Sequence, residues 1–332
     1  MKKKLLILFA LVASMTVSAQ QIAVVKGGET KLYNTLKEAL EGAESGSVVY
    51  LPGGGFPIAD SDTIRKRLTI IGITHKASSD NVDGRTTISG NLIFGEGSTG
   101  SALMGCYVTG NVNIGSKTSA VTDIMLRYNN MNAVIVNNSE CRNIVINQNY
   151  IRNTSDMGQT NAKITNNIVH SIKNVNGGYV AYNVITAYFS IWRSSVHSDY
   201  YVMSASNSTI CNNVFLQKAM SGSAVYWQFF TGSDNDVINN MAHKRNWGTD
   251  GISIEVEWTD VFEKNSGVST ASNYHFKNDY KDYEGKVGIY AGTGFSDGAL
   301  PPVPYIKDCK VDEQTNAEGK LNIRINVKAV TE

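Results

Sequence analysis

The most regular feature of the chain is a six-residue pattern of apolar and polar positions that recurs between about residues 88 and 267. Each copy has the form apolar, any, any, Asn, any, apolar. Six copies follow one another at intervals of 20, 18, 16, 30 and 27 residues, with their asparagines at Asn129, Asn149, Asn167, Asn183, Asn213 and Asn240. Three further copies lie outside this series: one contains Asn91, one has Cys106 in place of the asparagine, and residues 262–265 form a weak last copy. A variable period of this size indicates repeated supersecondary units separated by loops of different length.

Within these units apolar and polar residues alternate over short runs, and β-branched types are common, which predicts strands. An asparagine after a short strand is typical of a turn, because Asn tolerates left-handed backbone. Asparagines stacked at one corner can hydrogen-bond along the stack, which offsets the cost of burying their amides. The pattern predicts an all-β parallel β-helix, a solenoid whose turns bury apolar side chains against one another. The alternative, a β-sandwich with Asn-rich loops, explains the alternation but not the repeated position of the asparagine.

The segments on either side of the repeats are predicted to close the ends of the solenoid. Residues 33–43 place apolar side chains on one helical face, with Asn34 or Thr35 as the N-cap and Gly46 as the stop. Two strands are expected after this helix and two near the C-terminus, at 48–51, 68–71, 306–311 and 321–327. The C-terminal pair is too short for a domain of its own. It is expected to pack on the last turns or to pair with a partner protein.

The chain divides into four predicted segments. Three lysines, a short apolar run and a small-residue site at 17–19 are typical of a cleaved secretory signal. No later apolar run is long enough to span a bilayer, so the mature protein is expected in the periplasm, at the cell surface or outside the cell, without a transmembrane segment. The predicted division is a signal peptide at 1–19, a strand and capping helix at 20–46, the β-helix at 47–285, and a C-terminal loop and β-hairpin tail at 286–332.

Composition excludes some classes of function and leaves the cysteines open. The formal net charge is +1, charged residues make up 18% of the chain, and no basic stripe supports nucleic-acid binding. The four cysteines lack the spacing of a zinc site. Export permits disulfides, whereas buried free thiols are the favoured alternative for Cys106, Cys141, Cys211 and Cys309.

Several segments resemble the right-handed parallel β-helix proteins of the pectin-lyase-like superfamily. The helix and strands within 35–72 resemble the N-terminal start of that superfamily, and the asparagine corners resemble its asparagine ladder. Residues 288–294 and 300–304 resemble the C-terminal region of uncharacterised secreted β-helix proteins from Bacteroidetes-type bacteria. The resemblance implies a right-handed, single-stranded β-helix. It also implies that the active face is formed by the strand before the turn that precedes each asparagine corner.

The longest intervals, after Asn183 and Asn213, carry the largest insertions, and loops often hold functional residues. With Ile252, Ile254 and Val256 inward, two glutamates should point outward from one strand, with their α-carbons roughly 7 Å apart. Groups at comparable positions in three neighbouring turns are expected side by side, about 5 Å apart per turn. They are His197, Asp199, Tyr226, Trp227, Gln228, Glu255 and Glu257.

Paired carboxylates at Glu255 and Glu257 suit either a calcium site or an acid/base pair. Asp199 and His197 would add another carboxylate and a titratable base. A solvated surface is the alternative for the glutamates. Aromatic rings offer flat surfaces for sugars, although core packing is their alternative role. The predicted substrate contacts are Tyr188, Trp192, Tyr226, Trp227, Gln228 and Trp247.

The resemblance also implies a chemistry. Polysaccharide lyases of this fold use an Arg or Lys base beside acids that bind calcium, and Arg193 and Arg245 are the candidates. A basic run such as 243–245 is otherwise typical of a solvated turn. Residues 248–251 resemble the Asn-Thr-Asp-Gly motif of polygalacturonases, but that family's other motifs are absent. A hydrolase of that family is therefore not expected.

The predicted function is an exported β-helix protein that binds an extracellular polysaccharide. Cleavage by lyase or hydrolase chemistry and binding without cleavage both stay open, because no complete catalytic motif is present. A non-catalytic structural or adhesive surface protein is the alternative, with the long turns or the C-terminal strands serving a protein partner.

Overall fold

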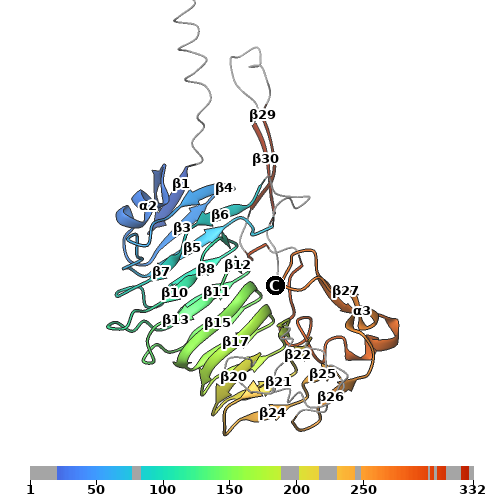
Figure 1. Ribbon diagram of the computed structural model, residues 1–332. Helices are drawn as coiled ribbons and strands as arrows, with labels where there is room; N and C mark the ends of the chain where they lie inside the picture. Colours follow the sequence, from blue (N-terminus) through green and yellow to red (C-terminus); the bar gives the residue numbers. More distant parts are fainter. Residues whose placement is uncertain are drawn as a thin grey trace, which may run out of the picture.

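Two long sheets contain most of the described chain and run side by side along one axis (Figure 1). Strands of neighbouring colour lie next to one another, so the sheets broadly follow the order of the sequence. The computed structural model describes residues 21–76, 84–187, 202–216, 230–243, 248–297, 300–302, 305–311 and 323–328.

The first sheet has 11 strands. The pairings of β2 with β1 and of β1 with β3 are antiparallel, and every later pairing in this sheet is parallel. In spatial order the strands are β2 (Glu29–Tyr33), β1 (Ile22–Lys26), β3 (Ser47–Leu51), β5 (Leu68–Gly72), β8 (Ala102–Met104), β11 (Met125–Arg127), β14 (Ile144–Asn147), β16 (Ala162–Thr165), β18 (Tyr179–Ala181), β21 (Thr209–Cys211) and β24 (Asp236–Ile238).

The second sheet has 15 strands, all paired in parallel. Its main row is β26 (Ile252–Ile254), β25 (Met241–His243), β22 (Val214–Phe215), β19 (Val184–Ile185), β17 (Ile168–Asn176), β15 (Tyr150–Thr160), β12 (Asn130–Met131), β9 (Tyr107–Val108), β6 (Thr86–Ser89) and β4 (Gly54–Pro57). A side row, joined to the main row through the long strands β15 and β17, contains β7 (Leu92–Phe94), β10 (Val112–Ile114), β13 (Val134–Val136), β20 (Met203–Ser206) and β23 (Phe230–Thr231).

The chain visits the first sheet, the main row and the side row in turn. After β8 in the first sheet come β9 in the main row and β10 in the side row, and β11 then returns to the first sheet. Each turn of chain therefore adds one strand to each row. Apolar side chains that point inward from all three rows join in one continuous core, for example Leu103, Val108, Val112, Leu126, Met131 and Val134.

The six repeated asparagines form one column, as predicted, and all six side chains are fully buried. The backbone N–H of Asn149 donates to Oδ1 of Asn167 at 2.9 Å, and Nδ2 of Asn149 donates to the same oxygen at 3.1 Å. The same pair of bonds links each asparagine to the next from Asn129 to Asn240. The N–H of Cys106 donates to Asn129 Oδ1 at 3.0 Å, so this copy extends the column.

Left-handed backbone occurs at the residue before each column asparagine, so its expected place at the asparagine itself was wrong. Asn149 illustrates the reason, because its Nδ2 donates to the carbonyl of Asn147 at 3.0 Å and thereby closes the turn over the intervening residue. The left-handed residues are Tyr128, Gln148, Asn166, Tyr182, Asn212 and Asn239, with φ from 51° to 59°.

The copy that contains Asn91 belongs to a different corner. Asn91 follows β6, and its Oδ1 accepts a hydrogen bond from the N–H of Asn111 at 2.9 Å. Oδ1 of Asn111 in turn accepts from Nδ2 of Asn132 at 2.8 Å. These three residues stack between the main row and the side row. The same local pattern thus forms turns at two corners, which sequence spacing alone does not distinguish.

The N-terminal helix α2 (Leu36–Gly42) begins where the sequence predicts. Thr35 is the N-cap: its Oγ1 accepts from the N–H of Glu38, and its own N–H donates to the Glu38 carboxylate, both at 3.2 Å. This capping box satisfies two backbone donors that a helix start leaves free. The buried side chains of Leu36, Ala39 and Leu40 then close this end of the core.

The last parallel strand is β26, whereas the sequence interpretation carried the parallel unit to residue 285. After β26 the chain forms α3 (Trp258–Val261), β27 (Phe262–Lys264), β28 (Asn273–Phe276) and the 3-10 helix η2 (Asn278–Tyr283). The interpretation of 262–265 as a last repeat copy was wrong, because β27 pairs antiparallel with β28. Aromatic side chains hold this part together, with Phe262 against Trp258, Tyr274 and Phe276.

The segment after β26 covers the outer face of the main row (Figure 1). Strands β15, β17, β19, β22 and β25 are apolar on that face as well as on the inner one. A second apolar cluster forms there, in which Tyr150, Ile168, Val184, Val214 and Met241 contact Trp258, Phe262, Tyr274, Phe276, Val287 and Ile289. Consecutive apolar pairs such as Ile168-Val169 and Val184-Ile185 are the sequence signal of strands covered on both faces.

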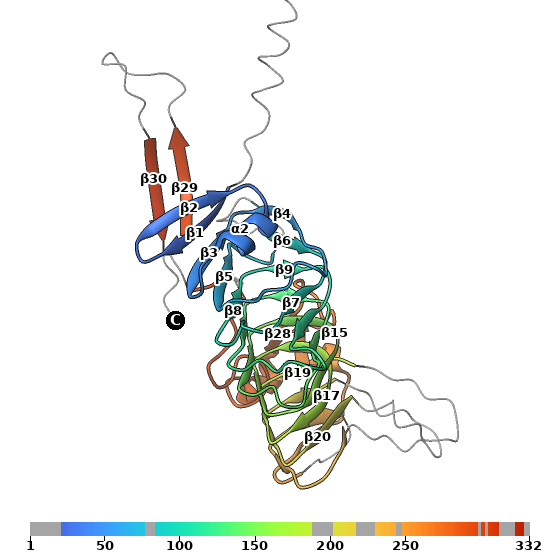
Figure 2. The ribbon, with the colours of Figure 1, turned by 90° about the vertical axis from the view of Figure 1, so that its left-hand side faces the viewer.

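The chain then runs back along the stack. A Cβ added to Gly105 would lie 3.0 Å from Cγ of Pro301, so the returning chain has reached an early turn. The expected C-terminal strands are present as β29 (Tyr305–Val311) and β30 (Ile323–Lys328), which pair antiparallel with each other. Neither pairs with any other described strand. The hairpin lies near the end that carries β1 and β4, and not on the last turns (Figures 1 and 2).

Three of the cysteines, Cys106, Cys141 and Cys211, are free and buried, as the favoured alternative predicted. Burial raises the pKa of the Cys106 thiol to about 12, so this thiol stays protonated. The side chain of Cys309 lies outside the described residues. Among the helices in the described part of the chain, none has the length and apolar character needed to cross a membrane.

Candidate functional site

Most of the predicted site residues lie outside the described part of the chain. They fall in the intervals 188–201, 217–229 and 244–247. The predictions that stay untested for this reason concern Tyr188, Trp192, Arg193, His197, Asp199, Tyr226, Trp227, Gln228, Arg245 and Trp247. Residues 1–20, which include the predicted signal peptide, are likewise outside it.

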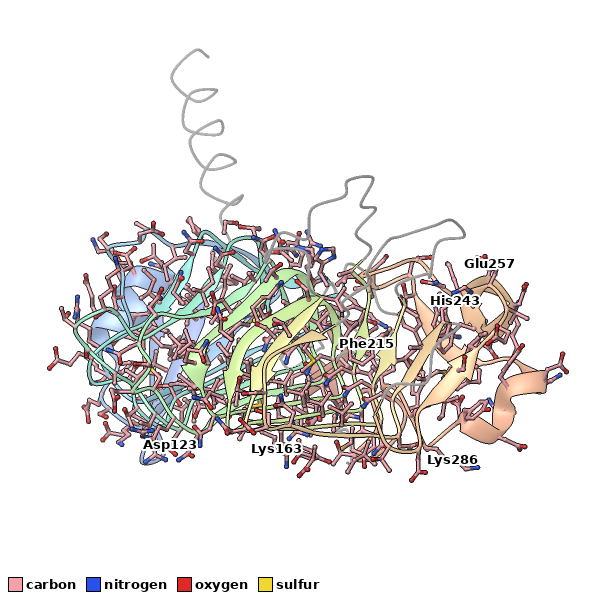
Figure 3. All side chains as sticks on the ribbon, turned by 60° about the horizontal axis from the view of Figure 1, so that its bottom comes forward. Asp123, Lys163, Phe215, His243, Glu257 and Lys286 are labelled. Carbon is pink, nitrogen blue, oxygen red and sulfur yellow. The ribbon has the colours of Figure 1, made fainter. Side chains whose placement is uncertain are left out.

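The two described members of the predicted site are Glu255 and Glu257. Strand β26 ends at Ile254, and Glu257 is already the N-cap of α3, so the expected single strand at 252–257 does not form. Both glutamates are exposed, and Val256 is 37% exposed instead of pointing into the core. Glu255 accepts a hydrogen bond from Ser253 Oγ at 3.0 Å. Figure 3 labels Glu257 at the end of the molecule that also carries His243.

No group of three or more His, Cys, Asp or Glu side chains is placed to hold a metal ion among the residues that the structure describes. The calcium site at Glu255 and Glu257 therefore stays a prediction. His243, the first residue of the predicted basic cluster, is buried, and its ring centroid lies 6.3 Å from that of Trp258. It contributes to packing under α3.

A groove of about 350 Å³ lies on the outer face of the first sheet. It crosses β11, β14, β16 and β18, which are strands that lead directly into the asparagine corners. Figure 3 labels Lys163 on the same long side of the molecule as Asp123 and Lys286. The lining residues are Met125, Arg127, Val145, Asn147, Lys163, Thr165, Asn166, Tyr179, Tyr182, Gly292 and Thr293.

The strand register arranges the floor of this groove in two rows. Parallel pairing aligns Lys163 with Val145 on one side and with Tyr179 on the other. The second row, two residues further along each strand, begins Arg127, Asn147, Thr165. Successive positions in a row are about 4.8 Å apart, the spacing of neighbouring strands.

Hydrogen bonds fix the second row. Nε of Arg127 donates to Oδ1 of Asn147 at 3.0 Å, and Nδ2 of Asn147 donates to Oγ1 of Thr165 at 3.0 Å. Nη2 of Arg127 also donates to the hydroxyl of Tyr128 at 3.0 Å. The guanidinium is thereby held in one orientation at the floor before any ligand binds.

The returning C-terminal chain builds one wall of the groove. Buried Asn166 donates through Nδ2 to the carbonyls of Ile289 and Ala291, at 2.9 and 2.6 Å. Its Oδ1 accepts a hydrogen bond from the hydroxyl of Thr293 at 3.0 Å. Gly292 lies between these contacts, against the ring of Tyr182. We call residues 287–297 the strap.

The groove carries positive charge and two phenols. Arg127 and Lys163 line it, and no Asp or Glu occurs among its described lining residues. Burial raises the pKa of Tyr179, and its hydrogen bonds with Cys211 and Tyr182 act in the same direction. Tyr179 is therefore a neutral phenol over the physiological range. The site can bind an acidic or neutral polar ligand by charge, stacking and hydrogen bonds.

None of these lining residues was among the site residues predicted from the sequence. The resemblance implied a different face, because the strand before the turn that precedes each asparagine corner belongs to the side row. Counting from the asparagines led to the insertions, and Glu255 follows a strand of the second sheet. An outward Lys or Tyr on a strand has the same sequence signature as any solvated face. The one available signal was the polar residue directly before the left-handed residue in three successive copies, at Arg127, Asn147 and Thr165.

Comparisons of the chain with protein-family models, with curated proteins and with solved structures found no match.

Proposed function

We propose that this protein is an exported right-handed parallel β-helix of the pectin-lyase-like type, which binds an extracellular polysaccharide in the groove of the first sheet. The order of the three strand rows and the buried asparagine column support the fold assignment. The N-terminal lysines and apolar run support export. The groove supports the choice of ligand.

The observation that carries the proposal is the composition of the groove. An extended polar floor repeats about every 4.8 Å along the stack, as a chain of linked sugar rings would require. Tyr179 and Tyr182 supply flat apolar surfaces beside amides and hydroxyls, the combination that sugar rings with polar edges need. Lys163 has no hydrogen bond or ion pair to other described residues, so its ammonium group is free for a ligand.

Binding is the activity that the described groove supports best. Glycoside hydrolysis commonly uses a pair of carboxylates, and the described lining contains none. Cleavage would depend on groups in the intervals 188–201 and 217–229, among them His197 and Asp199. Catalysis therefore stays the weaker form of the proposal.

The test is a glycan-panel binding assay with the full chain. Lys163→Gln removes the free charge and Tyr179→Leu removes a ring, and each is expected to weaken binding about tenfold, or 1.4 kcal/mol. Lys286→Gln is the matched control, because Lys286 is exposed and outside the groove. If both variants bind the glycan as tightly as the wild type, the groove is refuted as the site.

The second candidate, a structural or adhesive protein, is favoured by one observation. The β29–β30 hairpin pairs with no other described strand, and an isolated two-stranded sheet is marginally stable in water. A partner strand at its edge would stabilise it. If the wild-type chain binds no glycan on the panel, this candidate replaces the first.

A further inference from the structure

Two arginines stack on one tyrosine at the outer face of the second sheet. The Cζ atom of Arg85 lies 4.0 Å from the ring centroid of Tyr107, and that of Arg152 lies 4.7 Å from it. Arg85 directly precedes β6, on one side of β9, and Arg152 comes from β15 on the other side. Both guanidinium groups lie within the distance at which a ring attracts a cation.

Arg152 is held firmly in this position. Its Nη1 donates to Oδ1 of Asn130 at 2.8 Å, and its Nη2 donates to the carbonyls of Val108 and Thr109, at 3.0 and 3.1 Å. Its side chain thus crosses β12 to reach β9. Burial and the nearby charge of Arg85 lower the pKa of Arg152, although Tyr107 acts in the opposite direction. A guanidinium nevertheless stays charged in proteins.

Arg85 is positioned but leaves most of its donors free. Its Nε donates to the hydroxyl of Thr87 at 3.2 Å, which leaves both terminal nitrogens without a hydrogen bond to the described protein. No carboxylate forms an ion pair with Arg85 or Arg152 in the described part of the chain. Two like charges share one ring with no counter-charge from the described residues, and their repulsion is relieved when an anion binds.

Among the described residues the C-terminal segment passes beside this site, where Pro301 lies against Gly105. The apolar cluster beneath this segment begins at Tyr150, whose ring centroid lies 5.4 Å from that of Phe295, and continues along the later strands. Tyr107, Arg85 and Arg152 are each half-buried. The site therefore lies beside the covered part of the main row and is accessible to a ligand.

We propose that Arg85, Tyr107 and Arg152 form a binding site for the anionic group of an acidic polysaccharide, a carboxylate or a sulfate ester. A planar guanidinium with free terminal nitrogens binds such oxyanions through two parallel hydrogen bonds. Stacking on Tyr107 fixes the plane of Arg85 in advance, so little side-chain entropy is lost on binding. This site is on a different sheet from the groove, and the inference does not depend on the groove.

The test uses the full chain and isothermal titration with three polymers: dextran sulfate, polygalacturonate and neutral dextran. Sulfate-specific and carboxylate-specific recognition are separated by the first two, and neutral dextran reports contacts with sugar rings alone. Arg85→Gln is expected to weaken binding of the preferred acidic polymer at least about tenfold, or 1.4 kcal/mol. Tyr107→Leu is expected to weaken it as well. Arg142→Gln is the control, because Arg142 is exposed and paired with Glu140 at 2.7 Å.

Equal binding by wild type and Arg85→Gln would overturn the proposal, as would equal affinity of the wild type for dextran and for both acidic polymers. The salt dependence gives an independent readout, since loss of a carboxylate or sulfate contact reduces the number of released counterions. The slope of log affinity against log salt should be shallower for Arg85→Gln than for wild type. Failure of the groove proposal would appear separately, as unchanged glycan binding by the Lys163→Gln variant.

Discussion

A buried asparagine must satisfy one carbonyl oxygen and two amide hydrogens, and the column does this within the stack. Oδ1 of Asn167 accepts from the N–H and from Nδ2 of Asn149. Its Nδ2 donates to the carbonyls of Ile146 and Thr165 and to Oδ1 of Asn183, at 2.9 to 3.0 Å. Each asparagine is thus both a turn former and a link between turns, which explains why the residue recurs at this position.

Asn167→Ala should lower the free energy of unfolding by about 3 kcal/mol, because it leaves several buried backbone groups without partners. Denaturant unfolding followed by circular dichroism measures this loss. Asn176→Ala is the matched control, since the Asn176 side chain is exposed and among the described residues is hydrogen-bonded only to Asn207, and its effect should stay within about 0.5 kcal/mol. Equal stability of the two variants would contradict a structural role for the column.

Glu284 makes the stability of the C-terminal segment depend on pH. Burial alone would raise the pKa of its carboxyl, but the N–H of Phe276 at 2.9 Å, the hydrogen-bonded ring of His275 and nearby Lys281 together hold it below the ordinary value of 4.5. A depressed carboxyl pKa stabilises the folded state above the unfolded-state pKa. That contribution is lost as pH falls through the folded-state value.

Thermal unfolding of wild type and Glu284→Gln between pH 7 and pH 3 tests this. The variant should melt at a lower temperature near neutrality, and the difference should shrink as the pH falls below 4.5. A difference that grew on acidification would contradict the sign assigned to Glu284.

At the scale of elements, the strap depends on one close approach. Gly292 has φ of 63°, and a Cβ there would lie 2.8 Å from two ring atoms of Tyr182. The strap can therefore follow the corner, and hold one wall of the groove, only with glycine at this position. Its hydrogen bonds to Asn166 and to Gln148, which accepts from the N–H of Ser296 at 2.8 Å, fix its path.

Gly292→Ala should destabilise the protein by about 1–3 kcal/mol through overpacking against Tyr182, in addition to the cost of left-handed alanine. Gly294→Ala is the control: Gly294 has φ of 76° but no atom within 4 Å of an added Cβ, so it shares only the backbone cost. The difference between the melting temperatures of the two variants measures the cost of overpacking, because both variants share the backbone cost. Equal losses would show that the strap does not press on Tyr182.

At the scale of the whole molecule, the sequence could predict what is repeated and local. The asparagine column, the Thr35 cap and the first strands depend on residues close together in the chain or on a pattern used many times. The strap could not be predicted this way. Asn166 and Ala291 are 125 residues apart, and although Asn166 lies in a repeat copy, nothing in the repeat marks its contact with Ala291.

The groove could not be predicted from the repeat. The resemblance implied the strand before the turn that precedes each asparagine corner, which belongs to the side row, whereas the groove lies on the strands that lead directly into that corner. Its individual members could not be predicted either, because Lys163 and Tyr179 have no distinguishing pattern on an outward strand face. The glutamates were misplaced for a related reason: alternation at 252–257 suggested a longer strand, whereas the chain leaves the sheet after Ile254 and begins α3.

The most direct test of the central claim is a crystal structure of the full chain with an oligosaccharide from a glycan that the wild type binds. We expect sugar rings on the outer face of the first sheet, with one ring against Tyr179 and a polar or acidic group at Nζ of Lys163. An oligosaccharide bound away from β11, β14, β16 and β18, with the groove empty, would contradict the account.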